Sequence, residues 1–475
     1  MNVGRRMLGV GAVVLGACGP AMSEPPVVMS GGATATGSAA SQGPAGSAPA
    51  AVASAAPMGE TGELKGRAEA LVVAASKGDF AGAERDFNEQ MRGVLPADKL
   101  AEAWAQVEKQ YGRWQALEGV EQPGGAGKRL LFAHTKFEKS AVDVKIAFDE
   151  QGKVAGLFFL AVAPAWVAPS YAKADAVTER EVTVEGKGPA LPGTLTLPRT
   201  PGSHAAVVLV HGSGPNDRDE TVGAVRAFKD LAWGLASRGI VVLRYDKRTR
   251  VSPAGVVTAQ QEVLDGAHDA IELLGKQAEV DPKRRFVIGH SQGGEQAPRI
   301  ARDNPALAGV IVLAGNTRPL ADLIIEQLTY LQGLDPANHE LDRPLQNARS
   351  FKLIVDSPGL KPEQQVPIPL GGSATGAYFL FDRGYQPATV AKGLPQPLLV
   401  LQGERDYQVT MRDFEGWKKG LAGKKNASLR SYPGLNHMFV RGTGPSTPHD
   451  YDVAAHVDEA VVTDIATWID TGKLP

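Results

Sequence analysis

The sequence has almost no cysteine, and this shortage excludes two common ways of holding a protein together. Cys18 is the only cysteine in 475 residues. A disulfide within one chain needs two cysteines and a cysteine-ligated zinc site needs several, so neither is possible here. The chain also lacks a Walker loop, a dinucleotide-binding glycine fingerprint and a His-Glu-x-x-His zinc helix. We therefore expect stability from packing alone, no cofactor and no bound metal ion.

An excess of charge of one sign is also missing. The 50 lysines and arginines nearly balance the 52 aspartates and glutamates, and both signs are mixed along the chain. Such a chain creates no broad electric field that would attract nucleic acid or anionic lipid. The sequence therefore predicts no nucleic-acid partner, and it leaves protein partners open.

A short apolar run at the start of the chain has the pattern of an export signal. Arg5 and Arg6 precede the apolar and small residues of Leu8–Ala17, and Cys18 ends the run. The run is too short to cross a bilayer as a helix, but it fits a signal peptide over residues 1–18. The four residues that end at Cys18, Leu-Gly-Ala-Cys, resemble the lipobox of bacterial lipoproteins. That resemblance implies cleavage before Cys18 and a lipid on its sulfur.

The next segment reads as a spacer. Residues 19–61 are dominated by alanine, glycine, serine and proline, with Glu24 and Glu60 as their only charges. This composition buries too little apolar surface to fold, and a flexible tether of about 40 residues reaches on the order of 35 Å. With a lipid on Cys18, it predicts an exported protein of the bacterial cell envelope, held at a membrane on the periplasmic or outer surface. The alternative is a soluble secreted protein whose signal happens to contain a cysteine.

Residues 62–165 have the pattern of a small α+β domain. Apolar residues at three- and four-residue spacing predict helices, and alternating residues then predict strands. The expected helices are Glu63–Ala75, Phe80–Phe87 and Ala97–Tyr111, and the expected strands are Leu130–Phe137, Ala141–Phe148 and Val154–Ala163. The region resembles a small domain of unknown function found ahead of bacterial envelope hydrolases, thought to form a cone like that of nuclear transport factor 2. We expect His134 and Trp114 to serve packing or surface contacts.

After an expected linker at residues 166–179, the chain from 180 to 475 alternates strands with helices. An apolar run at Ala205–Val210 is continuous, as in a central strand covered on both faces. Alternation of this kind predicts a parallel sheet with right-handed crossovers. The rhythm breaks at about residues 317–392, where helical and proline-rich stretches predict a cap between the sixth and seventh strands. A helix over Val453–Asp470 is expected to close the chain.

The chemistry centres on the turn Gly289-His290-Ser291-Gln292-Gly293, which follows an apolar strand and precedes a helix pattern. A Gly-x-Ser-x-Gly turn places a serine in a strained strand-to-helix bend, and its glycines let the two elements approach closely. The helix N-terminus favours the negative charge that develops there. We predict Ser291 as a nucleophile; the alternative is a glycine-rich turn without catalysis.

A serine nucleophile needs a histidine base, and the base needs a carboxylate to orient it. Asp406 and His437 each follow an expected strand, Pro397–Leu401 and Ala427–Tyr432. The order Ser291, Asp406, His437 resembles that of the α/β-hydrolase family, and the resemblance spans about residues 180–470. Its Gly-x-x-Asp pattern points to Asp406. The competing residues are Glu404 for the acid, and His449 and His456 for the base.

The α/β-hydrolase resemblance also implies a site for the oxyanion. The backbone N–H of Gln292 would supply one donor, and the loop His211-Gly212-Ser213-Gly214-Pro215 would supply the second. We assign the second donor to Ser213, with Gly212 as the near alternative. His211 is expected to shape the loop. Taken together, the resemblance implies the α/β fold class: a doubly wound, mostly parallel α/β-hydrolase sheet with a helical cap, preceded by a small α+β domain.

Two charged segments and several aromatic residues remain open in function. The charged run at residues 216–220 could line the entrance of the site, or it could be a solvated loop with internal ion pairs. Arg244, Lys247 and Arg248 lie at the end of the next strand, at the active-site edge, where they could contact an acidic substrate; structural pairing with Asp246 or Asp217 is the other interpretation. In the cap, four aromatic side chains are candidates for an apolar acyl site, with core packing as the alternative. They are Tyr330, Tyr378, Phe379 and Phe381.

Together these patterns predict a serine hydrolase that cleaves carboxylic esters of small molecules through a Ser-His-Asp triad and an acyl-enzyme. A peptidase resembling prolyl oligopeptidase shares the sheet and triad, but residues 62–165 lack the blade repeats of a propeller. An acyl thioester hydrolase is a further enzymatic alternative. A non-catalytic envelope lipoprotein is the alternative outside enzymes.

Overall fold

The computed structural model describes residues 58–122, 129–162, 165–252, 258–369 and 372–475. The described residues form two compact units, one ending before residue 165 and one that runs from residue 165 to the end. The predicted signal peptide, the lipid site at Cys18 and nearly all of the expected spacer lie outside the described residues. No helix within those ranges is both long and apolar enough to cross a membrane.

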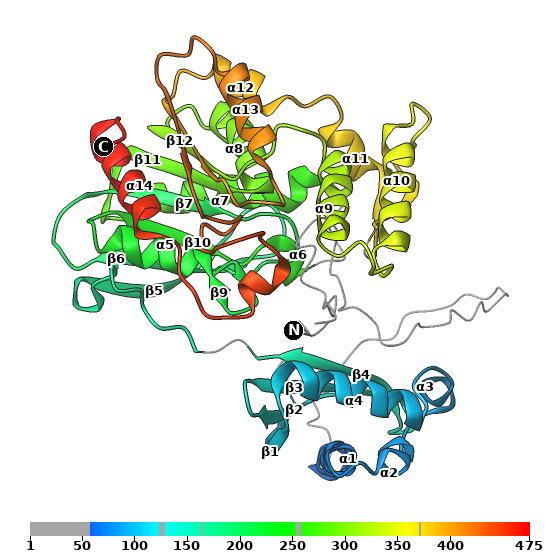
Figure 1. The fold of residues 1–475 in the computed structure, drawn as a ribbon. Helices are drawn as coiled ribbons and strands as arrows, with labels where there is room; N and C mark the ends of the chain where they lie inside the picture. The colour runs from blue at the N-terminus through cyan, green and yellow to red at the C-terminus, as the bar shows by residue number, and fades with distance from the viewer. Residues whose placement is uncertain (1–57, 123–128, 163–164, 253–257, 370–371) are drawn as a thin grey trace, which may run out of the picture. The chain divides into compact units, whose positions relative to one another are not determined.

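The smaller unit packs helices on an antiparallel sheet (Figure 1). Its elements are α1 (Met58–Ser76), α2 (Phe80–Glu84), α3 (Glu89–Val94), α4 (Ala97–Tyr111), β1 (Trp114–Glu121), β2 (Leu130–Phe137), β3 (Ala141–Phe148) and β4 (Val154–Ala161). The sheet order β1-β2-β3-β4 is a simple meander. Every second residue of β3 is buried, so one face of the sheet supplies the core.

Several features of the smaller unit differ from the prediction, including the start of its first helix, which is Met58 rather than Glu63. Strand β1 and helix α3 were not expected, and the second helix ends at Glu84 rather than at Phe87. Trp114 begins β1 and, partly buried, packs against the core of the smaller unit, as expected. His134 lies 2.7 Å from Asp143 (Nδ1 to Oδ1) and 3.4 Å from Glu121 (Nε2 to Oε1), which are contacts at the protein surface.

The larger unit is built on an eight-stranded, mostly parallel sheet. The strands in spatial order are β16 (Ala427–Tyr432), β15 (Leu398–Gly403), β12 (Gly309–Leu313), β11 (Val280–His290), β7 (His204–Val210), β10 (Val241–Tyr245), β6 (Leu191–Pro198) and β5 (Val177–Val184). Neighbours from β16 to β10 pair in parallel, whereas β6 and β5 are antiparallel. The carboxyl ends of the parallel strands therefore meet at one edge, where ligands bind in such sheets.

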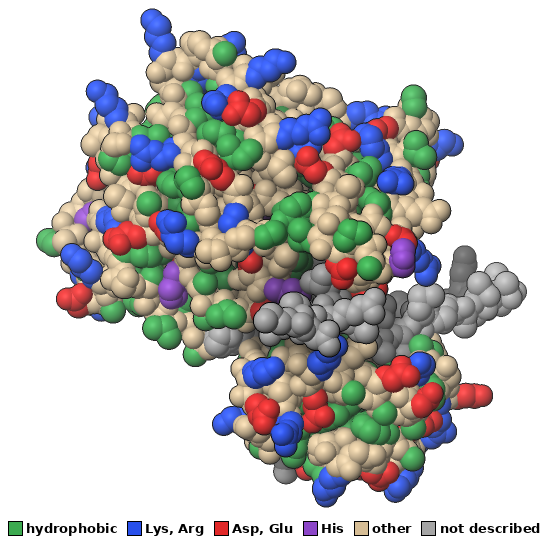
Figure 2. Space-filling model, in the orientation of Figure 1, with side chains coloured by type: hydrophobic (Ala, Val, Ile, Leu, Met, Phe, Trp, Pro, Cys, Tyr) green, Lys and Arg blue, Asp and Glu red, His purple; other side chains and the backbone are tan. Residues whose placement is uncertain are grey.

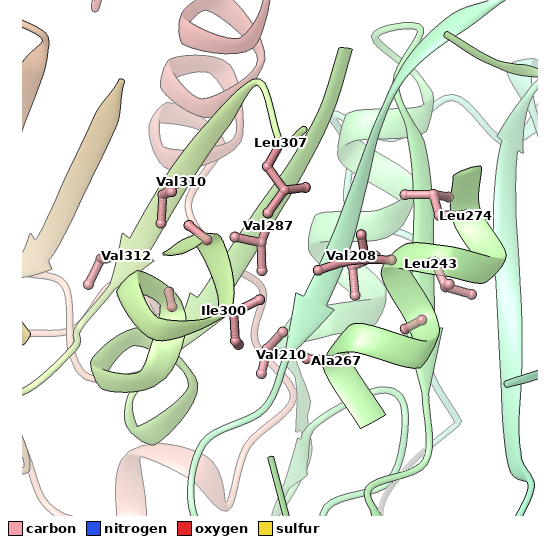
Figure 3. Packing of buried hydrophobic residues seen from close by; sticks show 14 of the residues in the cluster. Val208, Val210, Leu243, Ala267, Leu274, Val287, Ile300, Leu307, Val310 and Val312 are labelled. Carbon is pink, nitrogen blue, oxygen red and sulfur yellow. The ribbon is translucent and has the colours of Figure 1, made fainter. Parts of the chain in front are cut away.

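Helices cover both faces of this sheet. They are α5 (Ala227–Ala236), α6 (Arg248–Val251), α7 (Asp265–Gly275), α8 (Gln292–Asp303), α12 (Pro387–Gly393), α13 (Met411–Gly420) and α14 (Glu459–Thr471), with short helical turns η1 (Ala174–Ala176), η3 (Gln260–Leu264) and η4 (Pro448–Tyr451). On one face, Val208, Val287 and Val310 pack against residues of α7 and α8 such as Leu274 and Ile300 (Figure 3). Helices α5 and α14 cover the other face.

The cap lies between the sixth and seventh strands of this sheet in chain order, β12 and β15, as expected. Its elements are α9 (Leu320–Leu334), α10 (Asp342–Asp356), β13 (Gln365–Pro367), β14 (Ser373–Thr375) and α11 (Gly376–Asp382). Outside the cap, the larger unit also has a short hairpin of β8 (Thr221–Val222) and β9 (Val225–Arg226). The cap has its own apolar cluster around Ile324, Leu328 and Phe351. Helix α12 instead packs into the main core through Ala388 and Ala391, so the cap ends before it.

Several boundaries in the larger unit correct the sequence prediction. The last helix begins at Glu459 rather than at Val453, because the Asp458 side chain caps its N-terminus by accepting from the amide of Ala460. Helix α5 was not expected. Strand β5 already begins at Val177, and within the expected linker Trp166 donates from its ring nitrogen to Asp230 at 2.8 Å.

Charged side chains of both signs are interspersed on the face drawn in Figure 2. Basic side chains lie beside acidic ones on both units, in keeping with the near balance of the composition. Many of the closest pairs are exposed, such as Arg284 with Asp470 at 2.7 Å and Lys276 with Glu272 at 2.7 Å. Exposed pairs of this kind contribute about 0–1 kcal/mol each to stability.

Candidate active site

Ser291 lies in a tight turn between β11 and α8. Its backbone has φ 52° and ψ −117°, a left-handed conformation that is uncommon for a residue with a side chain. The flanking glycines make the turn possible. A Cβ on Gly289 would lie 2.1 Å from the carbonyl oxygen of Gly293, and one on Gly293 would lie 2.1 Å from that of Val210. The strain, on the order of 1–3 kcal/mol, is stored at the residue that the sequence predicts to be a nucleophile.

Asp406 and His437 come together across the loops that follow β15 and β16. Nδ1 of His437 lies 2.7 Å from Oδ2 of Asp406, and both residues are buried. The other carboxylate oxygen accepts the amides of Gln408 at 2.7 Å and Val409 at 2.9 Å. The carboxylate is therefore fixed by its own loop, and it holds the imidazole with Nε2 turned away from the acid.

The competing acid and bases lie elsewhere. Glu404 accepts the hydroxyl of Ser431 at 2.7 Å on the surface. His449 pairs with Asp452 at 2.7 Å and His456 with Asp230 at 3.0 Å, so neither contacts Asp406. Of the candidates considered from the sequence, the structure pairs only Asp406 with His437.

The loop after β7 lies against the nucleophile turn. A Cβ on Gly212 would lie 3.0 Å from the Cβ of Ser291, so the loop approaches this turn closely. The amide of Gly212 donates to Oε1 of Glu220 at 2.6 Å, and its carbonyl accepts from Asn216 at 3.0 Å. The Gly212 amide is thus engaged by a carboxylate.

His211 is buried between aromatic rings, as expected of a residue that shapes the loop. Its ring centroid lies 5.0 Å from that of Phe228 and 5.3 Å from that of Tyr245. Burial is the main cause that lowers the pKa of His211 to about 4. The ring is therefore neutral at physiological pH.

The turn of Ser291, the loop after β7 and the loop of His437 all border one cavity of about 270 Å³. Ser291, His437, Ser213, Gln292 and Gly212 all line it. The cap adds an apolar wall that includes Leu320, Leu323, Phe351, Tyr378 and Phe379. No group of three His, Cys, Asp or Glu side chains that could hold a metal ion occurs in the part of the chain that the structure describes.

Two of the four aromatic cap residues considered for the acyl site line this cavity, and two do not. Tyr378 and Phe379 contribute to its wall. Tyr330 instead stacks on Tyr407 with ring centroids 5.4 Å apart, and Phe381 packs beside Arg299. For Tyr330 and Phe381, packing is therefore the correct interpretation.

The charged segments at residues 216–220 and 244–248 form internal ion pairs, with partners other than those expected. Arg244 is buried and pairs with Asp219 and Glu179. Asp246 instead forms an ion pair with Arg218, with 3.2 Å between Oδ1 of Asp246 and Nε of Arg218. Because these basic groups already have carboxylate partners, they form the support of the site rather than a receptor for acidic substrates.

A buried pair beneath the site was missed by the sequence reasoning. Nδ1 of His290 lies 3.0 Å from Oε2 of Glu220, and Nε2 of His290 lies 3.0 Å from the backbone carbonyl oxygen of His437. Both ring nitrogens face acceptors, which favours the imidazolium. Burial opposes the charges of both groups, but their mutual attraction outweighs it: the pKa of His290 is raised and that of Glu220 lowered. The pair ties the Gly212 loop, the nucleophile turn and the His437 loop together.

Replacing Glu220 by glutamine is expected to lower the free energy of unfolding by about 3–5 kcal/mol, because it leaves a buried imidazolium without its counter-charge. Urea denaturation measures the change. The matched control is Glu279→Gln, which breaks the exposed pair with Arg180 and should cost less than about 1 kcal/mol. Equal losses in the two variants would contradict the role given to Glu220.

A second buried carboxyl group lies on the cavity wall. Burial, followed by the nearby charge of Asp382, raises the pKa of Glu295 well above its usual value. Arg299 lies 2.5 Å from Asp382 and is its ionic partner. Glu295 therefore favours the protonated form, so this part of the wall presents a neutral carboxyl to the cavity.

Glu295→Gln is expected to stabilise the protein increasingly as the pH rises. A carboxyl with a raised pKa holds a proton in the folded state that the unfolded chain has released, so the free energy of unfolding falls as the pH rises above the ordinary carboxyl pKa. The slope is at most about 1.4 kcal/mol per pH unit for one group. The test compares the melting temperatures of variant and wild type from about pH 5 to about pH 8. A difference that stays constant with pH would refute the assignment; Glu415→Gln, on the exposed surface of α13, is the control.

Comparison with known proteins gives consistent matches. A family model described as "Serine aminopeptidase, S33" matches residues 201–444, and one described as a protein of unknown function, DUF3887, matches residues 68–157. Esterase EstD of Thermotoga maritima is 36% identical over 395 residues, which cover 82% of this chain and 92% of that protein.

The solved structures that the chain matches are more distant in sequence. The hyperthermophilic esterase from the archaeon Pyrobaculum calidifontis is 18% identical with a TM-score of 0.42, and the match covers 63% of this chain and 87% of that one. Est1E from Butyrivibrio proteoclasticus is 18% identical with a TM-score of 0.39, over 54% of this chain and 90% of that one.

Proposed function

The chain belongs to the serine aminopeptidase S33 family of α/β-hydrolases and is a carboxylic ester hydrolase, and from that premise we propose that it works through an acyl-enzyme on Ser291. The observation that carries the proposal is the contact of 2.7 Å between His437 and Asp406 beside the strained turn of Ser291. His437 and Ser291 line the same cavity. This is the arrangement that a nucleophile, base and orienting acid require.

In the proposed reaction, the hydroxyl of Ser291 attacks the ester carbonyl while Nε2 of His437 takes its proton. Asp406 keeps the imidazole in the required tautomer and stabilises the imidazolium that forms. The tetrahedral intermediate collapses when His437 gives the proton to the leaving alcohol. A water molecule, deprotonated by His437, then attacks the acyl-enzyme, and release of the carboxylic acid restores Ser291.

The proposed oxyanion donors are the backbone amides of Gln292 and Ser213. Gln292 begins α8, and an amide in the first turn of a helix has no carbonyl partner within that helix. The amide of Gly212, the near alternative, already donates to Glu220 at 2.6 Å and would have to leave this carboxylate to serve an oxyanion. Gln292 and Ser213 both line the cavity that Ser291 also lines.

The cavity supports a small-molecule ester with an uncharged acyl group. Its cap wall is apolar at Leu320, Leu323 and Phe351, and its volume is about 270 Å³. Its acidic groups are neutralised, Glu220 by His290 and Asp382 by Arg299. On the apolar wall a charged acyl group would lose its hydration without gaining a partner. The lining arginine, Arg383, already donates to the carbonyl oxygens of Val355 and Ser357.

Rates on a matched panel of substrates test this function. The panel holds p-nitrophenyl esters of graded acyl length, aminoacyl p-nitroanilides and acyl thioesters, with Ser291→Ala as the background. We expect the esters to be cleaved fastest, with a pre-steady-state burst of p-nitrophenol when substrate is in excess over enzyme. Faster cleavage of the aminoacyl amides would instead support a peptidase, in line with the family description, and faster cleavage of thioesters would support a thioesterase. No Ser291-dependent turnover of any substrate would support a binding lipoprotein.

We also propose that the protein is exported and anchored in the bacterial cell envelope through a lipid on Cys18. The support comes from the sequence, where Leu-Gly-Ala-Cys ends a signal-like run. Expression of the full-length gene in bacteria fed an alkyne-tagged palmitate should label the mature chain that begins at Cys18 and place it in the membrane fraction. Cys18→Ser should abolish both; unchanged labelling would contradict the anchor.

A further inference from the structure

Lys247 is a buried lysine for which the reaction above has no role. It follows β10 and its side chain is only 2% exposed. Its ammonium lies 2.7 Å from the carbonyl oxygen of Gly212, 3.0 Å from Oε1 of Gln292 and 2.9 Å from Oε1 of Glu262. An ammonium has three N–H donors, so these contacts use all of them. A buried charge is costly to keep, so its placement calls for a specific explanation.

Lys247 is not among the residues that line the described cavity, so it acts on the site only through its neighbours. The most informative neighbour is the carbonyl of Gly212, which shares one peptide unit with the N–H of Ser213. The described residues contain no cis peptide bond, and in a trans peptide the C=O and N–H point in opposite directions. A cation held on the carbonyl therefore turns the Ser213 N–H away from itself and polarises it.

The second neighbour is Gln292, whose backbone N–H is the other proposed oxyanion donor. Its side-chain oxygen accepts from Lys247, and its side-chain nitrogen donates to the hydroxyl of Tyr378 at 2.7 Å. One cation thus contacts the residues on both sides of the proposed oxyanion site. We propose that Lys247 is a positioning residue that aligns and polarises the two oxyanion donors, a role that rests on the proposed acyl-enzyme function.

The same network connects the oxyanion site to the cap. Glu262, the carboxylate partner of Lys247, lies in the π-helical turn η3 and accepts the hydroxyl of Tyr378. Tyr378 belongs to α11 of the cap and lines the cavity. A substrate that contacts Tyr378 in the cap wall is therefore connected, through the hydrogen bonds of Tyr378 to Glu262 and Gln292, to the ammonium group of Lys247 that positions the oxyanion donors. Tyr378→Phe should reproduce the effect of losing Lys247 to a smaller degree.

The test compares wild type with Lys247→Met, which keeps the length of the side chain and removes its charge. Loss of an oxyanion donor lowers kcat by about 10²–10³-fold, and donors that remain but are misaligned should cost roughly 10- to 100-fold. KM should change by less than about threefold, because the ground state does not use the oxyanion site. Affinity for a trifluoromethyl ketone, which forms a tetrahedral adduct, should fall by the same factor as kcat. Affinity for the matching secondary alcohol should not change.

A second variant separates positioning from folding. Lys247→Met combined with Glu262→Gln removes both charges, so it should recover much of the stability lost in the single variant, because neither charge is left buried alone. We expect its kcat to stay low. Two results would overturn the proposal and show that Lys247 and Glu262 form only a structural ion pair. One is a wild-type kcat in the double variant; the other is unchanged kcat and ketone affinity in the single variant.

Two controls complete the design. Arg430→Met breaks the ion pair of 2.7 Å with buried Asp464, which belongs to α14, and should lower the melting temperature without changing kcat. Ser291→Ala reports on the proposed function itself. If that variant keeps its turnover, the acyl-enzyme route fails; if it loses turnover while Lys247→Met does not, only the role of Lys247 fails.

Discussion

Ser291→Ala is expected to lower kcat for a p-nitrophenyl ester by roughly six orders of magnitude, the loss that removal of a serine nucleophile causes when base and acid depend on it. Alanine keeps the Cβ that the turn already accommodates, so the strained backbone at φ 52° should persist. The measurement is steady-state turnover with enzyme concentrations high enough to detect the background. Circular dichroism and the melting temperature should match the wild type.

The matched control is Ser431→Ala, which removes a hydroxyl that hydrogen bonds only to the exposed carboxylate of Glu404 among the contacts given by the structure. Its kcat should equal that of the wild type. Turnover in Ser291→Ala within about tenfold of wild type would show that another group performs the attack, and the proposed reaction would then be wrong.

Asp406→Asn is expected to lower kcat by about 10⁴-fold with little change in KM. The amide has almost the shape of the carboxylate, but its NH₂ group can face Nδ1 of His437 and favour the wrong tautomer, and it cannot stabilise the imidazolium. The contact of 2.7 Å between Oδ2 and Nδ1 is the geometry that this substitution disturbs. Because neutral side-chain contacts remain possible, the fold should be retained.

Glu404→Gln is the matched control for Asp406, since it changes an acid two residues away that faces the surface. It should leave kcat unchanged. A larger loss in Glu404→Gln than in Asp406→Asn would assign the orienting acid to Glu404. A wild-type rate in both variants would show that His437 works without an acid.

The order of elements in the larger unit could be predicted from the sequence because periodicity and glycine placement report directly on strands and tight turns. The apolar run of β7, the Gly-x-Ser-x-Gly turn and the break in rhythm at the cap are all local signals. Helix α5 was missed because its residues are apolar nearly all round, which obscures the amphipathic pattern. Strand β1 was missed because its burial does not alternate regularly.

The side chains that support the site could not be predicted, because their meaning depends on contacts between distant segments. Glu220 is one member of a charged run in the sequence, and only the fold places it beside His290 of the nucleophile turn. Lys247 likewise was one of three basic residues in the run 244–248 that could contact an acidic substrate or pair with Asp246 or Asp217. Its burial against Glu262 and Gly212 depends on how three loops meet.

The small unit illustrates a different limit. Its strands β2 and β3 were predicted to the residue because they alternate regularly, and its match to a domain of unknown function agrees with the resemblance seen in the sequence. What the domain does is not encoded in such alternation, since the pattern specifies only which face is buried. The same holds for the ester that the cavity accepts, which depends on the shape that α9, α10 and α11 give to its wall.

Covalent labelling by a fluorophosphonate tests the central claim most directly, because the reagent phosphonylates a serine only where base, acid and oxyanion donors activate it. After labelling of the wild type, proteolysis and mass spectrometry should find one modified residue, Ser291, in the peptide that follows β11. Labelling should be absent in Ser291→Ala and strongly slowed in Asp406→Asn. Modification of a different residue, or equal labelling of wild type and Ser291→Ala, would contradict Ser291 as the nucleophile.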